Sequence, residues 1–132
     1  MKDFRDLKVW EKAHQLAVDL YASTQLFPRE EIYGLTSQLR RSAISVPSNI
    51  AEGCGRDGDR DLARFLQIAM GSASELEYQL LLAHDLGFME KTNHEQFSDR
   101  IREIKRMLAS FLQTLRQKTP EFSTPRSPSN DR

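Results

Sequence analysis

The chain has 132 residues, enough for one domain with a hydrophobic core, and its 19 basic and 19 acidic side chains give a formal net charge of +0. That balance excludes the overall basic excess typical of nucleic-acid-binding proteins, although a local basic face remains open. The single cysteine excludes an internal disulfide, and no stretch approaches the roughly 20 apolar residues of a membrane span, so we expect an unprocessed cytoplasmic protein with no membrane partner.

The first predicted helix covers about residues 6–26. Its apolar residues repeat at helical spacing and form one stripe, which consists of Leu7, Trp10, His14, Ala17, Tyr21 and Thr24. Asp6 is expected to cap the start of the helix, and Pro28 lies just past its end. Because His14 falls on the stripe, we interpret it as a core or interface histidine.

The second predicted helix covers about residues 29–52, with acidic residues in its first turn that suit the helix dipole. Its apolar stripe consists of Leu35, Leu39, Ala43, Val46 and Ile50. Pro47 lies inside the segment and removes a backbone hydrogen bond, so we expect a kink or a brief break there. Gly53 and Gly55 are predicted to end the helix, as glycine does where the backbone turns left-handed.

The third predicted helix covers about residues 59–86 and is closed by Gly87. The stripe on its inner face consists of Leu62, Phe65, Leu66, Ala69, Ser72, Ala73, Leu76, Leu80 and Ala83. Neither this segment nor any other shows the sustained alternation of apolar and polar residues that is typical of a strand. The sequence therefore favours an all-α protein.

The fourth predicted helix has the most regular pattern in the chain. Thr92 and Glu95 have the spacing of a capping box, and the apolar stripe that follows consists of Phe97, Ile101, Ile104, Leu108, Phe111 and Leu115. Pro120 stops the helix, and residues 119–132 are rich in Ser, Pro, Thr and Asn, which predicts a disordered tail. Because short connections favour antiparallel neighbours, residues 1–118 are predicted to form one up-down-up-down four-helix bundle.

Four runs of the sequence resemble one known family: residues 6–14 (DLKVWEKAH), 33–41 (YGLTSQLRR), 46–53 (VPSNIAEG) and 64–77. This is the bacterial four-helix-bundle family related to proteins encoded in intervening sequences of 23S ribosomal RNA genes. It includes the accessory protein of diversity-generating retroelements. The resemblance implies a homopentameric, barrel-like assembly of bundles. It also implies nucleic-acid binding and, in the retroelement branch, a reverse-transcriptase partner.

A polar stripe runs beside the apolar stripe of the second helix. Its members are Gln38, Arg41, Ser45, Ser48 or Asn49, and Glu52, with Glu75 and Gln79 at matching depth on the third helix. Buried polar groups need hydrogen-bond partners. We therefore interpret the stripe as a structural hydrogen-bond network, within the bundle or between subunits. The alternative is a strip that contacts a ligand or nucleic acid.

Charge is spread unevenly between the last two helices. Residues 65–91 carry a net charge of −3 and residues 92–118 a net charge of +3. We expect adjacent antiparallel helices of opposite sign to attract each other modestly, and a phosphate-binding face is the alternative. The candidate nucleic-acid-binding residues are Arg100, Lys105 and Arg106 on the fourth helix, and Arg40, Arg41, Arg56, Arg60 and Arg64 near the second helix and the central turn.

The sequence shows no nucleophile–base pair, metal-ligand cluster or phosphate loop, so we predict a non-enzymatic protein without a metal or cofactor. Cys54 has no evident histidine partner and is interpreted as an unreactive thiol. The favoured function is an oligomeric scaffold or adaptor that binds copies of itself. The alternatives are an accessory protein that binds nucleic acid or a nucleic-acid enzyme, and, with least support, a catalytic site shared between subunits and built from Glu52, Arg41 and Glu75.

Overall fold

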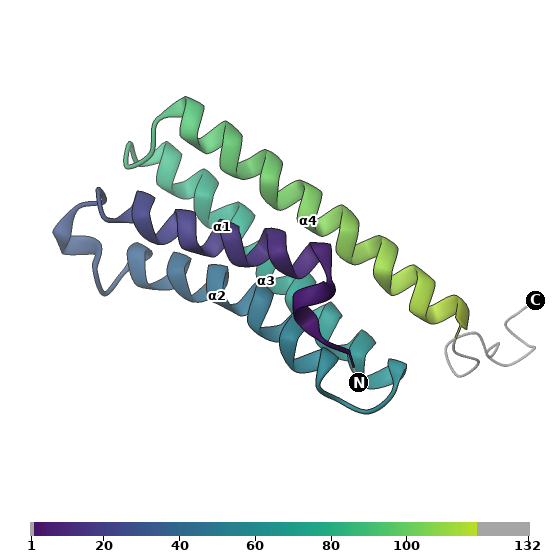
Figure 1. Ribbon diagram of the computed structural model, residues 1–132. Helices are drawn as coiled ribbons and strands as arrows, with labels where there is room; N and C mark the ends of the chain where they lie inside the picture. The colour runs from purple at the N-terminus through teal and green to yellow at the C-terminus, as the bar shows by residue number, and fades with distance from the viewer. Residues whose placement is uncertain (1, 119–132) are drawn as a thin grey trace, which may run out of the picture.

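The structure is a computed structural model that describes residues 2–118. It contains four α-helices, α1 (Lys8–Thr24), α2 (Leu35–Cys54), α3 (Asp59–Asp85) and α4 (Lys91–Lys118), and two short 3-10 helices, η1 (Phe4–Asp6) and η2 (Arg29–Glu31). Successive helices run antiparallel and are joined by short turns (Figure 1). This confirms the predicted all-α four-helix bundle. The predicted disorder of residues 119–132 lies outside the described residues.

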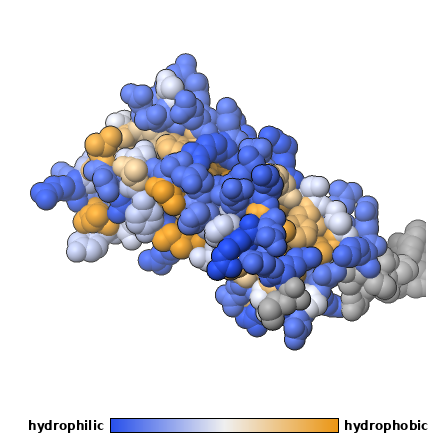
Figure 2. All heavy atoms as spheres, viewed as in Figure 1, coloured by the Kyte–Doolittle hydropathy of each residue, from blue (hydrophilic) through white to orange (hydrophobic). Residues whose placement is uncertain are grey.

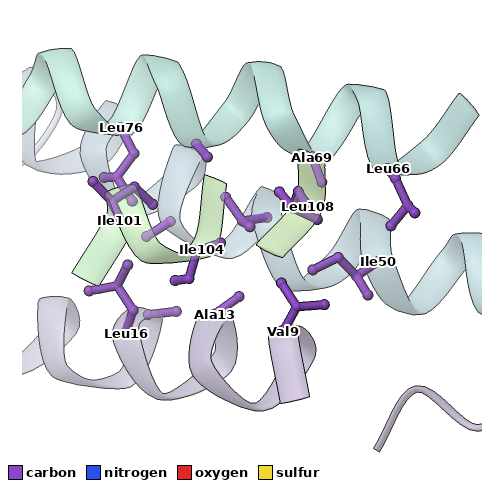
Figure 3. Packing of buried hydrophobic residues seen from close by; sticks show 14 of the residues in the cluster. Val9, Ala13, Leu16, Ile50, Leu66, Ala69, Leu76, Ile101, Ile104 and Leu108 are labelled. Carbon is purple, nitrogen blue, oxygen red and sulfur yellow. The ribbon is translucent and has the colours of Figure 1, made fainter. Parts of the chain in front are cut away.

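The helices pack in a square. α2 contacts α1 and α3, and α4 contacts α3 and α1. Each helix therefore has two neighbours, and the contact between α1 and α4 closes the square. Side chains from all four helices point into one shared interior (Figure 3). Fully buried residues include Leu16, Leu20, Leu39, Ile50, Leu66, Leu76, Ile104 and Leu108. Within residues 2–118, none of the helices is both long and apolar enough to cross a membrane.

The predicted inner faces of α2, α3 and α4 are largely those of the structure. Leu112 joins the predicted inner face of α4, because it is buried, whereas the predicted Phe111 is only partly buried. The predicted stripe of α1 is confirmed at Ala17 and Thr24 and was wrong at its other members, which are only partly buried or exposed. The residues of α1 that are buried are Val9, Ala13, Leu16, Ala17, Leu20 and Thr24. α1 carries two apolar stripes side by side; the slimmer aliphatic one enters the core, and the one with Trp10, His14 and Tyr21 lies along its edge.

Three of the predicted helix starts also differ. Asp6 does not cap α1, whose N-cap residue is Leu7 and has no side-chain cap; Asp3 instead accepts a hydrogen bond from the backbone N–H of Arg5. Residues 29–34 form η2 and a turn, so α2 begins later than predicted. α4 begins at Lys91, which places the predicted cap Thr92 inside the first turn. At the start of α2, the Glu31 side chain accepts a hydrogen bond from the backbone N–H of Leu35 at 3.0 Å.

Of the two glycines predicted to end the second helix, Gly55 is its C-cap residue, although with a right-handed backbone (φ −83°), and Gly53 acts differently. α2 continues without interruption through Pro47, and Gly53 lies inside it. A Cβ at Gly53 would lie 3.0 Å from Leu62 Cδ1 and 3.0 Å from Phe65 Cβ, so this glycine permits α2 and α3 to approach closely. The positive-φ residues among those described are Gly58 (φ 88°) and Gly87 (φ 83°), and they form the turns before and after α3.

Candidate functional site

An apolar groove lies between α1 and α2 on the outside of the bundle. Its volume is about 540 Å³, and it is lined by Phe4, Trp10, His14, Ala17, Val18, Tyr21, Ile44, Pro47, Ser48 and Ala51. The lining includes no Asp, Glu, Lys or Arg. Figure 2 shows hydrophobic residues exposed among the hydrophilic ones on the face that carries α1 and α2. Exposed apolar side chains gathered in one groove make it a candidate interaction site.

Aromatic contacts hold the α1 wall of the groove in place. The Trp10 ring stacks on His14 with centroids 4.8 Å apart and an angle of 8°, and Phe4 meets Trp10 edge-on at 4.8 Å. The side chains at the groove centre are open to solvent, with Val18 48% and Ile44 43% exposed. His14 is also exposed, so it is not a core histidine, and the interface interpretation stays a prediction. Packed rings therefore form this wall, and its apolar surface is accessible.

The predicted polar stripe forms only in part. Ser45 and Ser72 join α2 to α3 through a hydrogen bond of 2.7 Å between their hydroxyls. The Asn49 amide donates to the Ser45 carbonyl at 2.8 Å and to the Ser45 hydroxyl at 2.9 Å. Gln79 donates to Glu75 at 3.4 Å, in a separate contact along α3. Glu52 instead accepts a hydrogen bond from Arg56 at 2.9 Å. Ser72 was assigned to the apolar stripe, and its position opposite Ser45 becomes visible only in the packed bundle.

The remaining members of the stripe border a polar hollow of about 320 Å³ between α2 and α3. It is lined by Tyr33, Ser37, Gln38, Arg41, Ser42, Ser45, Ser72 and Glu75. Arg41 and Gln38 are exposed and form no ion pair or hydrogen bond within residues 2–118. Beside the hollow, Gln79 is buried and its Oε1 has no hydrogen-bond partner in the described part of the chain. The hydrogen-bond network therefore covers the middle of α2 and does not include the polar side chains nearer its N-terminus.

Arg40 was a nucleic-acid candidate, and the structure places it in a structural role. Its Nε donates to Thr24 Oγ1 at 2.8 Å and its Nη2 to the Tyr21 carbonyl at 3.1 Å, in the last turn of α1. The guanidinium also lies over the Tyr21 ring, 4.5 Å from its centroid. A cation in this position stabilises the negative end of the α1 dipole. These bonds leave less of Arg40 for an external phosphate.

The three arginines near the central turn lie among carboxylates and an aromatic ring. Arg56 and Arg64 both lie over Phe65, 4.9 Å and 4.5 Å from its centroid. Arg56 also pairs with Glu52, and Arg64 pairs with Asp61 at 3.2 Å. Arg60 borders a hollow of about 440 Å³ that is lined by Asp57, Arg60, Asp61, Ala63, Arg64, Gln67 and Arg116. The acidic residues reduce the positive potential of this end of the bundle.

Ion pairs between α3 and α4 bear out the expectation that their opposite charges attract. Glu77 accepts hydrogen bonds from Lys105 at 2.9 Å and from Arg102 at 3.1 Å. The hydrogen bond from Lys105, followed by that from Arg102, holds the pKa of Glu77 below its usual value of 4.5 against the opposing effect of burial. Arg100 is likewise engaged, with Asp19 of α1 at 2.9 Å. Of the predicted basic cluster on α4, Arg106 alone forms no ion pair or hydrogen bond within residues 2–118.

Chemically reactive groups are sparse in the described residues. Cys54 is buried, and desolvation, the largest effect on it, raises the pKa of its thiol above 9.0. A thiol in this setting is a weak nucleophile. Across residues 2–118, no three His, Cys, Asp or Glu side chains are grouped so as to hold a metal ion.

The comparisons with known proteins agree with this geometry. The sequence profile of the family described as 23S rRNA-intervening sequence protein matches residues 5–110. The chain is also similar to a crystal structure described as a protein with unknown function from the S23 ribosomal protein family from Bacteroides thetaiotaomicron, with 25% identity, a TM-score of 0.73, and coverage of 80% of this chain and 95% of that chain. No match is found among curated proteins. The chain belongs to the family of 23S rRNA-intervening sequence proteins.

Proposed function

We propose that this chain is a non-enzymatic scaffold that assembles with copies of itself through the groove between α1 and α2. The observation that carries the proposal is the exposed, uncharged and aromatic-walled surface of that groove. Burying the exposed halves of Val18 and Ile44 would each contribute about 1 kcal/mol, since complete burial of such side chains contributes about 1.5–3 kcal/mol. The motif resemblance supports five subunits in the assembly.

The distribution of charge supports the same proposal. Three of the eight candidate nucleic-acid residues form contacts between helices: Arg40 binds α1, Arg100 pairs with Asp19, and Lys105 pairs with Glu77. Side chains that are engaged internally contribute less to a phosphate-binding surface. The groove, by contrast, has apolar groups in water that the apolar surface of a partner subunit would cover. A cytoplasmic scaffold of identical subunits fits both features.

The test measures the mass of the full chain by size exclusion with light scattering. The unmodified protein is expected at about five times its 15.2 kDa chain mass. Val18→Glu and Ile44→Glu are each expected to reduce the mass toward that of a monomer, because an assembly would bury an unpaired carboxylate. Leu26→Glu is the matched control, since Leu26 is 86% exposed in the turn outside the groove. A monomeric unmodified protein would contradict the proposal.

Nucleic-acid binding is the second candidate, favoured by the exposed and unengaged guanidinium groups of Arg41 and Arg106. A gel shift with RNA and duplex DNA at low and moderate salt tests it. If the candidate holds, the affinity falls steeply with salt and Arg41→Glu with Arg106→Glu weakens it on every sequence. Arg102→Glu is the control, because Arg102 is engaged with Glu77. The absence of a complex with the unmodified protein at low salt would remove this candidate.

A further inference from the structure

Three stretches without a charged residue lie side by side in the bundle. They are residues 13–18 of α1, 42–51 of α2 and 65–74 of α3. The hydrogen bond between Ser45 and Ser72 places the second and third stretches at the same height. Residues Ala17 and Pro47, which line one groove, do the same for the first and second. Depletion of charge is typical of the buried centre of a protein interface.

On the α2–α3 side of this uncharged zone, the surface forms a ridge that could fit the groove between α1 and α2. Ile68 is 43% exposed. Its neighbours Gly71 and Ser72 are small, so the isoleucine projects from the α3 surface. Of the polar side chains beside it, Ser45, Ser72 and Asn49 are already hydrogen-bonded to one another inside the chain. A partner can therefore cover this face without leaving the Ser45–Asn49 network unpaired.

We infer that copies of the chain pack head to tail, with the α2–α3 face around Ile68 of one copy lying in the α1–α2 groove of the next. This rests on the proposed self-assembly and names its interface. The two faces are different, so the contact is heterologous. The two faces are adjacent sides of the square bundle and meet at α2. Each subunit is therefore rotated relative to the one before it, and successive contacts allow a ring of subunits to close.

A second copy fits the groove because the uncharged zones of two copies match when the bundles stand side by side at the same height. A shift along the bundle axis would bring Arg64 or Glu75, which border the zone on α3, against the apolar groove. Burying an unpaired charge there is strongly unfavourable. The zone therefore sets both the partner and the register of the contact.

Cross-linking between single-cysteine chains tests the inference. One chain carries Ser48→Cys, in the groove, and a differently tagged chain carries Ile68→Cys, both with Cys54→Ala. The two chains are expressed together and treated with a short thiol-reactive linker. Efficient linkage of the two different chains, with little linkage in either chain alone, is expected. Linkage of Ser48→Cys chains to one another, or no linkage, would overturn the head-to-tail contact.

A charge placed at the ridge separates failure of this inference from failure of the proposed function. Ile68→Lys is expected to lose assembly and give the mass of one chain. Leu81→Lys, at a site 44% exposed on the same helix but outside the zone, is expected to retain the assembled mass. If the unmodified protein is a monomer, self-assembly and the interface both fail. If it assembles and Ile68→Lys still does so, the interface alone is wrong.

Discussion

The Arg40 side chain of α2 is bonded to the Thr24 hydroxyl of α1, with 2.8 Å between Nε and Oγ1. The same hydroxyl donates to the Leu20 carbonyl at 2.7 Å, so this buried group is satisfied both as donor and as acceptor. The second bond from Arg40 goes to the Tyr21 carbonyl in the last turn of α1, where backbone carbonyls lack N–H partners within the helix. Arg40 thus fastens the end of α1, which forms one wall of the groove, to α2.

Arg40→Lys is expected to lower the free energy of unfolding by about 1–2 kcal/mol. A lysine has one ammonium group and cannot reproduce the forked pair of bonds or the stacking on Tyr21. Urea unfolding measures the change. Arg41→Lys is the control, because Arg41 is exposed and unengaged, and it should change stability by less than about 0.5 kcal/mol. Equal effects of the two substitutions would show that Arg40 does not fasten the helices.

Gly53→Ala is expected to destabilise the protein by about 1–3 kcal/mol. The added methyl group would lie 3.0 Å from Phe65 Cβ, and overpacking at a close helix contact outweighs the gain in helix propensity. Gly71→Ala is the matched control on α3, because a Cβ there meets nothing within 4 Å. That change should stabilise the helix in the monomer by about 0.5–1 kcal/mol. Thermal or urea unfolding of both variants in dilute solution gives the comparison.

Glu77→Gln is expected to reduce stability at neutral pH by about 1 kcal/mol, because Lys105 and Arg102 lose their anionic partner. The pKa of Glu77 is lowered in the folded protein from its usual value of 4.5. The carboxylate therefore contributes stability above about pH 4.5 and loses it as the pH falls through the folded pKa. The difference between the variant and the unmodified protein should shrink toward zero in acid.

Urea unfolding at a series of pH values measures this difference. Glu95→Gln is the control, because the Glu95 carboxylate is exposed and lies 4.0 Å from Lys91. A difference for Glu77→Gln that stays constant from neutral to acid pH would contradict the assigned ion pairs.

Cys54 is expected to react slowly with a thiol reagent in the folded protein at pH 8. Burial keeps the reagent out, and the raised pKa of the thiol lowers the fraction of reactive thiolate. Reaction followed by absorbance should be at least about tenfold faster in denaturant, where the pKa returns to its ordinary range. Equal rates in the two conditions would show that the end of α2 is open.

Much of the fold could be predicted from the sequence. In α2, α3 and α4 the apolar residues form one dominant stripe, so Leu39, Leu76 and Ile104 identify the inner face of their helices. α1 shows where periodicity fails. Its segment carries two adjacent apolar stripes. The large side chains of Trp10 and Tyr21 make the stripe at the edge of the core look like the buried one. Hydropathy alone does not tell which stripe a neighbouring helix covers.

Less of the candidate site could be predicted. Periodicity places Trp10, His14 and Tyr21 on one apolar stripe, so the sequence identifies part of the groove lining, but as core for Trp10 and Tyr21 and as core or interface for His14. The other wall comes from Ile44 and Pro47 of α2, and which side of α2 meets α1 depends on the arrangement of the bundle in space. The sequence likewise predicts Arg40 as a basic surface residue. Its partners lie across a turn, and only tertiary packing fixes their position.

Native mass spectrometry of the full chain tests the central claim of self-assembly most directly. At micromolar concentration and moderate ionic strength, the unmodified protein is expected to appear as one species with the mass of about five chains of 15.2 kDa. Ile44→Glu should move the signal to the mass of one chain, while Leu26→Glu should leave it in place. An unmodified protein that appears only at the mass of a single chain would contradict the account.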